Sequence, residues 1–185
     1  MPGSEELVCL LDDDGRQVGV ERKASVHTTT TRLHQAFSCH IFDAAGRTLV
    51  TRRALSKATW PGVWTNSVCG HPAPGETFDH AIRRRAADEL GLELSEPTIV
   101  LPNFRYRAVD ASGIVENELC PVFVARQQHN PNDALVPNPN EVCEWAWVDP
   151  ASLERSVAMV PFAFSPWLVL QLRAGAFANV GFQRP

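Results

Sequence analysis

The sequence predicts an α+β sandwich, built of many short strands and a few helices. Short apolar runs precede acidic turns that end at glycine at residues 12–15, 43–46 and 110–113, a pattern typical of strands joined by tight turns. Residues 77–90 carry one apolar stripe at helical spacing. A hydrophobic content of 44% over 185 residues is sufficient for one globular domain with a substantial core.

Most of the chain up to residue 124 is predicted to form strands and turns. Residues 7–11 form a short strand that the first turn closes. Residues 36–42 and 48–51 flank the second turn and indicate a hairpin, and residues 104–109 and 114–124 flank the third and indicate another. A strand resumes at residues 143–148. The intervening segment, His129 to Asn140, is rich in Asn and Pro and lacks periodicity, which predicts a surface loop.

Two helices are predicted. In the first, Phe78, Ile82, Ala86 and Leu90 recur at i, i+4 spacing, and the following Gly91 suits a helix C-terminus. The second begins at Ser165, because serine is a good N-cap and the next residue is a proline suited to the first turn. It is expected to run to about residue 174.

Composition indicates a cytoplasmic protein that acts on a small anion. No run of eighteen apolar residues exists, and residues 1–7 carry acidic side chains where a signal peptide would carry basic ones, so no membrane partner is expected. The net charge of −4 argues against a nucleic-acid partner, although cations gather at residues 52–57 and 83–85. The cysteines are odd in number and widely spaced, which argues against a disulfide framework: Cys9, Cys39, Cys69, Cys120 and Cys143.

Residues 70–92 resemble the Nudix box, whose pattern is G-x5-E-x7-R-E-U-x-E-E-x-G-U with U aliphatic. Gly70, Glu76 and Arg84 match, but Arg85 stands where a glutamate is expected and Asp88 where the first of the paired glutamates is expected. Nudix hydrolases use these carboxylates to gather magnesium ions on a diphosphate and to activate water. The altered box therefore predicts a diphosphate that is held and not cut.

Other residues suggest chemistry, although each has a plainer explanation. Glu116 and Glu118 are two apart in a predicted strand and project from one face, which could be a solvated face or, together with His27, His34 and His71, a site for Mn²⁺, Zn²⁺ or Fe²⁺. Glu89 follows Arg85 by four residues, so the two form either an ion pair or a site for Mg²⁺ and a diphosphate. Cys69 is either an ordinary buried thiol or a reactive one.

The whole chain resembles the type I isopentenyl-diphosphate Δ-isomerases, a family within the Nudix superfamily. The motifs that carry the resemblance are TRLH at 31–34, TRRALSK at 51–57, WPGVWTNSVCGHP at 60–72, FRYRA at 104–108, GIVENE at 113–118 and FSPW at 164–167. The family interconverts isopentenyl and dimethylallyl diphosphate for isoprenoid biosynthesis, through proton addition and removal with a tertiary carbocation-like state between. The resemblance implies a Nudix-type α/β/α sandwich with a mixed central sheet and a Nudix-box helix.

The resemblance also implies roles for individual residues. One transition metal, Mn²⁺ or Zn²⁺, is expected on His27, His34, His71, Glu116 and Glu118. Glu89 and Cys69 are further metal-binding residues, Glu89 holding Mg²⁺ with the substrate diphosphate. Cys69 and Glu118 are expected to be the catalytic pair, with Tyr106 assisting Glu118. The expected substrate contacts are Lys23, Arg53, Lys57 and Arg85 on the diphosphate and Trp167 on the cation.

One domain is expected over residues 1–185, with an N-terminal extension to about residue 34 that supplies metal ligands and a tail from about residue 175. A monomer acting on a small molecule is expected. The main alternative is a Nudix hydrolase of a nucleoside diphosphate derivative, against which Arg85 and Asp88 argue. A regulatory metal-binding module would not need Cys69, Glu118 and a cationic cluster together.

Overall fold

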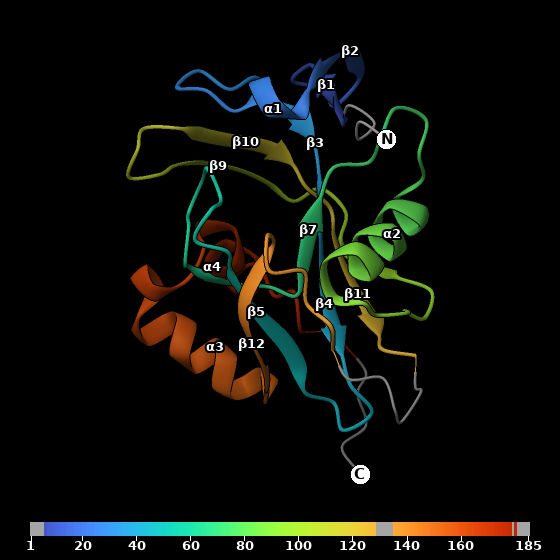
Figure 1. Ribbon diagram of the computed structural model, residues 1–185, viewed down its shortest axis with the longest axis vertical. Helices are drawn as coiled ribbons and strands as arrows, with labels where there is room; N and C mark the ends of the chain where they lie inside the picture. Colours follow the sequence, from blue (N-terminus) through green and yellow to red (C-terminus); the bar gives the residue numbers. More distant parts are fainter. Residues whose placement is uncertain (1–5, 129–134, 179, 181–185) are drawn as a thin grey trace.

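Two mixed β-sheets form the framework of the molecule, and the longer helices pack on the larger one, whereas the short helix Lys23–Val26 packs on the smaller one (Figure 1). The computed structural model describes residues 6–128, 135–178 and 180. The smaller sheet has the order β2 (Gln17–Arg22), β1 (Leu7–Leu11), β3 (His34–Gln35), β10 (Val115–Leu119) and β9 (Arg105–Val109). The larger has the order β12 (Val142–Val148), β5 (Thr48–Arg53), β4 (Phe37–Phe42), β11 (Val122–Arg126) and β8 (Thr98–Leu101), with β6 (Trp64–Thr65) on β5 and β7 (Val68–Gly70) on β4. Strands β10 and β3 are parallel, as are β11 and β4, so the predicted mixed pairing is confirmed.

Helices cover both faces of the larger sheet. The helical segments are α1 (Lys23–Val26), α2 (Phe78–Leu90), α3 (Pro150–Met159), the 3-10 turn η1 (Pro161–Ala163) and α4 (Pro166–Arg173). Helix α2 packs on one face against Phe37 and Ile41, whereas α3 and α4 pack on the other against Val50 and Val122. Because side chains alternate along a strand, Ser38 of β4 faces away from α2 and toward α4. The α+β Nudix-type layering that the sequence predicts is confirmed.

Helix α2 begins and ends where its sequence predicts. The Thr77 hydroxyl accepts a hydrogen bond from the His80 backbone N–H at 3.3 Å, and Gly91 ends the helix in the left-handed conformation at φ 66°. Ile82, Ala86 and Leu90 of the predicted stripe are fully buried. Arg85 and Glu89 are buried as well, next to the stripe, so the two residues do not form a solvent-exposed ion pair.

The predicted hairpin of residues 36–42 and 48–51 is wrong beyond its turn. Strands β4 and β5 pair at Phe42 and Thr48 and then diverge, because residues 64–70 enter between them as β6 and β7. The inserted segment satisfies backbone groups on both sides. The Ser67 hydroxyl accepts from the Ile41 N–H at 2.7 Å and donates to the Leu49 carbonyl at 2.7 Å. The inserted segment, residues 64–70, places Cys69 between β4 and β5.

The single strand predicted at residues 114–124 is also wrong, because it consists of two strands in different sheets. β10 ends at Leu119 and β11 begins at Val122. Pro121 has no N–H to donate to a ladder, and a proline therefore favours a break at this point. The break moves the chain from the smaller sheet, which carries Glu116 and Glu118, into the core of the larger one.

Other elements follow the sequence closely. Strand β1 has the predicted bounds, β12 starts one residue early, and α4 is capped by Ser165, whose side chain accepts from the Leu168 N–H. The sequence patterns do not predict strands β2, β3, β6, β7 and β8 or helices α1 and α3. Residues 129–134 of the predicted loop and most of the predicted tail lie outside the described residues. Among the described residues, no helix has the length and apolar content that spanning a lipid bilayer requires.

Candidate active site and metal centre

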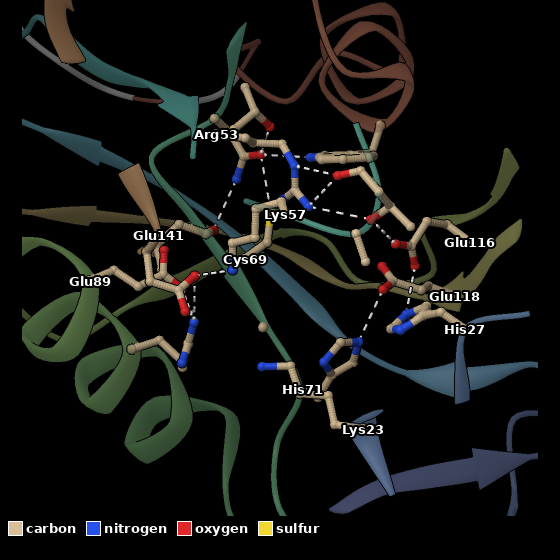
Figure 2. Close-up of a pocket in the computed structure, with 18 of the residues that line it drawn as sticks. Lys23, His27, Arg53, Lys57, Cys69, His71, Glu89, Glu116, Glu118 and Glu141 are labelled. Carbon is tan, nitrogen blue, oxygen red and sulfur yellow. Dashed lines mark hydrogen bonds and ion pairs between the residues drawn. The ribbon is translucent and has the colours of Figure 1, made fainter. Parts of the chain in front are cut away.

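A cavity of about 540 Å³ collects nearly all the predicted site residues. Its walls come from both sheets and from α1, α2 and α4. Of the predicted set, the following line it: Lys23, His27, Arg53, Lys57, Cys69, His71, Arg85, Glu89, Tyr106, Glu116, Glu118 and Trp167. His34 is fully buried beside the cavity. Figure 2 shows His27, His71, Glu116 and Glu118 to one side of Cys69, with Glu89 and Glu141 to the other.

Four of the five predicted metal ligands converge. His27 follows α1, His34 begins β3, His71 follows β7 and Glu118 lies in β10, yet one ligand atom from each lies within 4.8 Å of all the others. The imidazole ring centroids are 5.1 to 5.7 Å apart. The parallel pairing of β3 with β10 sets His34 directly opposite Glu118. Glu116 lies next to this group, with its Oε2 2.9 Å from Nε2 of His27.

The nitrogen and oxygen atoms of this group have lone pairs available to coordinate a metal cation. Nδ1 of His34 lies 3.0 Å from the Arg32 carbonyl, which can only accept, so Nδ1 carries the hydrogen and Nε2 is left with a free lone pair. Among the described residues, Nε2 of His27, Nε2 of His34 and Oε2 of Glu116 are buried without a hydrogen-bond partner. Buried polar atoms are rarely left unpaired. Three imidazoles and two carboxylates fit a divalent transition metal.

Polar contacts orient the two carboxylates. Thr59 donates to Oε1 of Glu116 at 2.9 Å. Burial opposes the charge on Glu118, but the neighbouring His34 and His71 outweigh burial and hold the pKa of the Glu118 carboxyl well below its ordinary value. Glu118 is therefore an ionised carboxylate at neutral pH, as a metal ligand and proton acceptor must be.

Cys69 lies at the centre of the cavity in β7. Its Sγ donates to Oδ1 of Asn66 at 3.1 Å and lies 3.3 Å from Oγ of Ser38 on the paired strand. Burial raises the pKa of the Cys69 thiol to about 12, partly offset by the hydrogen-bond contacts with Ser38 and Asn66. Cys69 is therefore a protonated thiol before any reaction, with its proton held in place by Asn66.

Aromatic rings form one wall beside Cys69. Trp167 packs on Tyr106 with ring centroids 5.9 Å apart and donates from Nε1 to Oδ1 of Asn66 at 3.0 Å. Trp60 meets Trp167 edge-on at 5.4 Å and has a positive φ of 43°, which is unusual for a residue other than glycine. Tyr106 pairs with Glu118 across β9 and β10. Burial, followed by the Glu118 and Glu116 charges, raises the pKa of Tyr106 well above 10 and keeps the phenol neutral.

A buried charge cluster forms the far end of the cavity. Arg85 forms an ion pair with Glu89 and lies 3.4 Å from Oε2 of Glu141, which also pairs with Lys57. The intrahelical pair that the sequence offered as the plainer explanation is therefore present. Both of its members also line the cavity. Burial raises the pKa of Glu89 despite the nearby Arg85, which shows that this carboxylate lacks full charge compensation.

Lys23 and Arg53, the other predicted diphosphate contacts, have protein partners of their own. Nζ of Lys23 lies 2.5 Å from Oε2 of Glu6. Arg53 donates to the Thr59 carbonyl at 2.8 Å, and its guanidinium carbon lies 5.4 Å from the centroid of the Trp167 ring. Arg53 thus supports the loop that orients Glu116 as well as facing the cavity.

Sequence reasoning missed several residues of this site. Glu141 follows an Asn and Pro-rich segment that carries no signal of a functional role. Asn66 lies inside the quoted motif at 60–72, and its buried amide could have been noticed as a partner for the thiol three residues later. Ser38 sits in an apolar strand, where the alternation of side chains is the available signal.

The Nudix-box segment keeps the helix but not the acidic residues of the pattern. Glu76 forms a two-point ion pair with Arg84, with both N–O distances 2.8 Å, and so fixes the loop before α2. Asp88 is exposed and does not line the cavity. Arg85 forms an ion pair with Glu89, the box acid that reaches the cavity. Among the box residues, the arrangement does not gather several carboxylates on one diphosphate as hydrolysis requires.

Comparisons with known proteins agree with this geometry. The model of the NUDIX domain family matches residues 32–168. Curated proteins named isopentenyl-diphosphate Delta-isomerase are 62% identical in Clavibacter michiganensis subsp. michiganensis (93% of this chain, 87% of that protein) and 57% identical in Leifsonia xyli subsp. xyli (94% and 92%). One from Corynebacterium efficiens is 53% identical over 93% of this chain and 91% of its own length.

Solved structures show the same fold at lower identity. DR0079 from Deinococcus radiodurans superposes with a TM-score of 0.67 at 21% identity, covering 91% of this chain and 98% of that chain. The Nudix hydrolase RenU from M. smegmatis gives 0.55 at 19% identity, covering 96% and 98%. With a family model over most of its length and relatives more than half identical, this chain belongs to the isopentenyl-diphosphate Δ-isomerase family of Nudix-domain proteins.

Proposed function

We propose that this protein interconverts isopentenyl diphosphate and dimethylallyl diphosphate. The observation that carries the proposal is that Cys69 and Glu118, two groups able to transfer protons, line one cavity between an aromatic wall and a cationic end. General acid–base catalysis requires both groups within reach of one substrate. The family assignment supports the same reaction.

The reaction needs one proton given and one taken. A proton added to the terminal methylene of isopentenyl diphosphate forms a C–H bond from the π electrons and leaves a tertiary cation. Loss of a proton from the adjacent chain methylene returns an electron pair as the new double bond. We assign these transfers to Cys69 and Glu118, which exchange roles in the reverse direction, and Tyr106 as a neutral phenol assists Glu118.

The aromatic wall protects the cation between the two transfers. The Trp167 side chain is 4% exposed and lines the cavity, where its ring face can stabilise positive charge by on the order of 2 kcal/mol when water is excluded. Water in this position would trap the cation as an alcohol. The cavity wall therefore determines which product forms.

The diphosphate fits the cationic end of the cavity. Lys57 and Arg85 are held there by Glu141 and Glu89, and Lys23 lies on the same wall. A diphosphate would take over their hydrogen bonds, and Glu89 would hold a Mg²⁺ that supplies positive charge to the diphosphate. Binding energy gained here orients the reacting carbons at a distance.

The histidine and glutamate group fits one divalent transition metal, for which we propose Mn²⁺ or Zn²⁺. His27, His34, His71, Glu116 and Glu118 would hold it. When bound, the metal supplies fixed positive charge that orients Glu118 and biases its protonation. The Arg32 carbonyl and the Thr59 hydroxyl would hold His34 and Glu116 in place as ligands.

The test is direct. Purified protein is incubated with isopentenyl diphosphate, Mn²⁺ and Mg²⁺, and dimethylallyl diphosphate and inorganic phosphate are measured together. We expect the isomer without phosphate release. Phosphate or diphosphate release without the isomer would instead support hydrolysis, and neither product under any metal condition would reject both readings.

A further inference from the structure

We propose that Ser38, held by Gln171 and His40, is a positioning residue that donates a hydrogen bond to the Cys69 sulfur when that sulfur has lost its proton. This inference rests on the proposed isomerisation. It concerns three side chains of β4 and α4 beneath the cavity, none of which lines it. Their hydrogen bonds form one chain that ends at the sulfur.

The chain is continuous over three contacts. Nε2 of His40 lies 3.1 Å from Oε1 of Gln171. Nε2 of Gln171 donates to Oγ of Ser38 at 2.7 Å, and Oγ of Ser38 lies 3.3 Å from Sγ of Cys69. Ser38 and His40 alternate with Cys39 along β4, so both reach toward α4 while Cys39 packs against the core under α2.

The hydrogens on this chain have one consistent direction. Because the Gln171 amide gives its N–H to Ser38, its oxygen faces His40, and Nε2 of His40 must carry the hydrogen. Burial lowers the pKa of His40 to about 4, so this imidazole stays neutral and keeps that tautomer. The Ser38 oxygen is then already an acceptor, and its own hydrogen is free to point at a sulfur.

Two sulfurs are in reach, and the chemistry favours Cys69. Sγ of Cys120 lies 3.5 Å from Oγ of Ser38, slightly farther than Sγ of Cys69. As a thiol, Cys69 donates to Asn66; once the proton leaves, the same Asn66 oxygen faces an anion. The Ser38 hydroxyl supplies the donor that the anion then needs.

The complete burial of these three polar side chains supports a functional role for them. Ser38, His40 and Gln171 are all 0% exposed. Burying polar groups costs free energy even when they are paired, and an apolar core of the same shape is often as stable or more so. A chain of donors that converges on the proposed catalytic thiol gives those buried groups a use that packing alone does not.

The test is Ser38→Ala, followed at the level of kcat and KM. We expect kcat for isomerisation to fall at least tenfold with KM unchanged within twofold, since the donor matters only once charge develops on sulfur. Ser38→Thr keeps the hydroxyl and should recover most of the rate. The matched control is Thr48→Val, which removes another buried hydroxyl, one that lies away from the cavity.

A second variant tests the chain as a unit. Gln171→Met should lower kcat in the wild-type background and cause no further loss in Ser38→Ala, because both act through one hydroxyl. Independent, multiplicative losses would overturn the chain. Cys120→Ala should retain activity, and a loss matching that of Ser38→Ala would show that the hydroxyl serves Cys120 and would also overturn the proposal.

A separate readout distinguishes failure of this inference from failure of the proposed function. The rate of Cys69 alkylation by iodoacetamide, followed by peptide mass spectrometry at fixed pH and metal loading, should fall severalfold in Ser38→Ala and recover in Ser38→Thr. An inactive wild type with this alkylation pattern would reject the isomerase and keep the contact. Full kcat and unchanged alkylation in a folded Ser38→Ala would reject the contact and keep the isomerase.

Discussion

Cys69 differs from an ordinary buried thiol in its neighbours. Asn66 accepts a hydrogen bond from its thiol, Trp167 packs beside it, and Cys69 lines the cavity. Burial raises the pKa of the thiol to about 12, so the group is protonated at neutral pH. These contacts support the proposed role of Cys69 in proton transfer.

Cys69→Ala should fold normally and lose isomerisation about a hundredfold or more, the share typical of an acid–base group. A methyl group fills most of the volume of the thiol but cannot transfer a proton. The measurement is dimethylallyl diphosphate formation beside the thermal midpoint. A variant that keeps more than about a tenth of the rate would remove Cys69 from the mechanism.

At the scale of elements, the Nudix-box segment positions its charges by pairing them. Glu76 fixes the start of α2 through Arg84, and Arg85 and Glu89 form a buried pair one turn apart. Breaking a buried pair by removing one partner is costly, about 3–5 kcal/mol. The substitution of a box glutamate by Arg85 therefore changes both the chemistry of the helix and its stability.

Arg85→Lys should raise KM for isopentenyl diphosphate about tenfold with little effect on kcat. Lysine keeps the charge and much of the pairing with Glu89, but loses the planar fork that can bind a carboxylate and a phosphate together. Steady-state kinetics decide the case, with Arg83→Lys on the same helix as the control. An unchanged KM would mean that Arg85 serves the ion pair alone.

Glu76→Gln should destabilise the protein by about 2 kcal/mol at neutral pH, after an allowance for solvent screening. Arg84 is the largest cause that lowers the pKa of Glu76 from 4.5 to about 2. A carboxyl with a depressed folded-state pKa stabilises the fold above pH 4.5, and this contribution is lost as pH falls from 4.5 toward 2. Denaturant unfolding at pH 7 and pH 3 should show a smaller difference between variant and wild type at the lower pH. An equal difference at both would contradict the assignment.

At the scale of the whole molecule, the metal-binding group joins segments from separate parts of the chain. His27 and His34 precede the larger sheet in sequence, His71 follows its inserted strand, and Glu118 comes from the smaller sheet. A cation held by all of them would link the N-terminal segment to both sheets. We therefore expect metal binding to stabilise the native state.

Removal of the transition metal with a chelator should lower the thermal midpoint of the wild type by several degrees and abolish isomerisation. His34→Ala should already have lost most of its metal, and the chelator should then change its midpoint little. Elemental analysis and thermal unfolding measure both effects. Full metal occupancy in His34→Ala, with a wild-type response to the chelator, would mean that the five-ligand site is wrong.

Local sequence signals are sufficient to predict the elements whose ends depend on neighbouring residues. Helix α2 starts at Thr77 and ends at Gly91 because both caps act within one turn, and β1 is set by its own apolar run. The family resemblance also identified the residues that gather in the cavity. Matches to long motifs identify these residues one by one. The spacing of the residues in the sequence does not show which of them are in contact in the folded protein.

Tertiary structure decided the contacts between distant segments. The divergence of β4 from β5 depends on residues 64–70 filling the gap, and the break at Pro121 becomes visible once the two strands join different sheets. Glu141 and Ser38 entered the site for the same reason. A side chain's neighbours across a sheet or in a cavity are fixed by packing between elements, and neither periodicity nor capping along one segment carries that information.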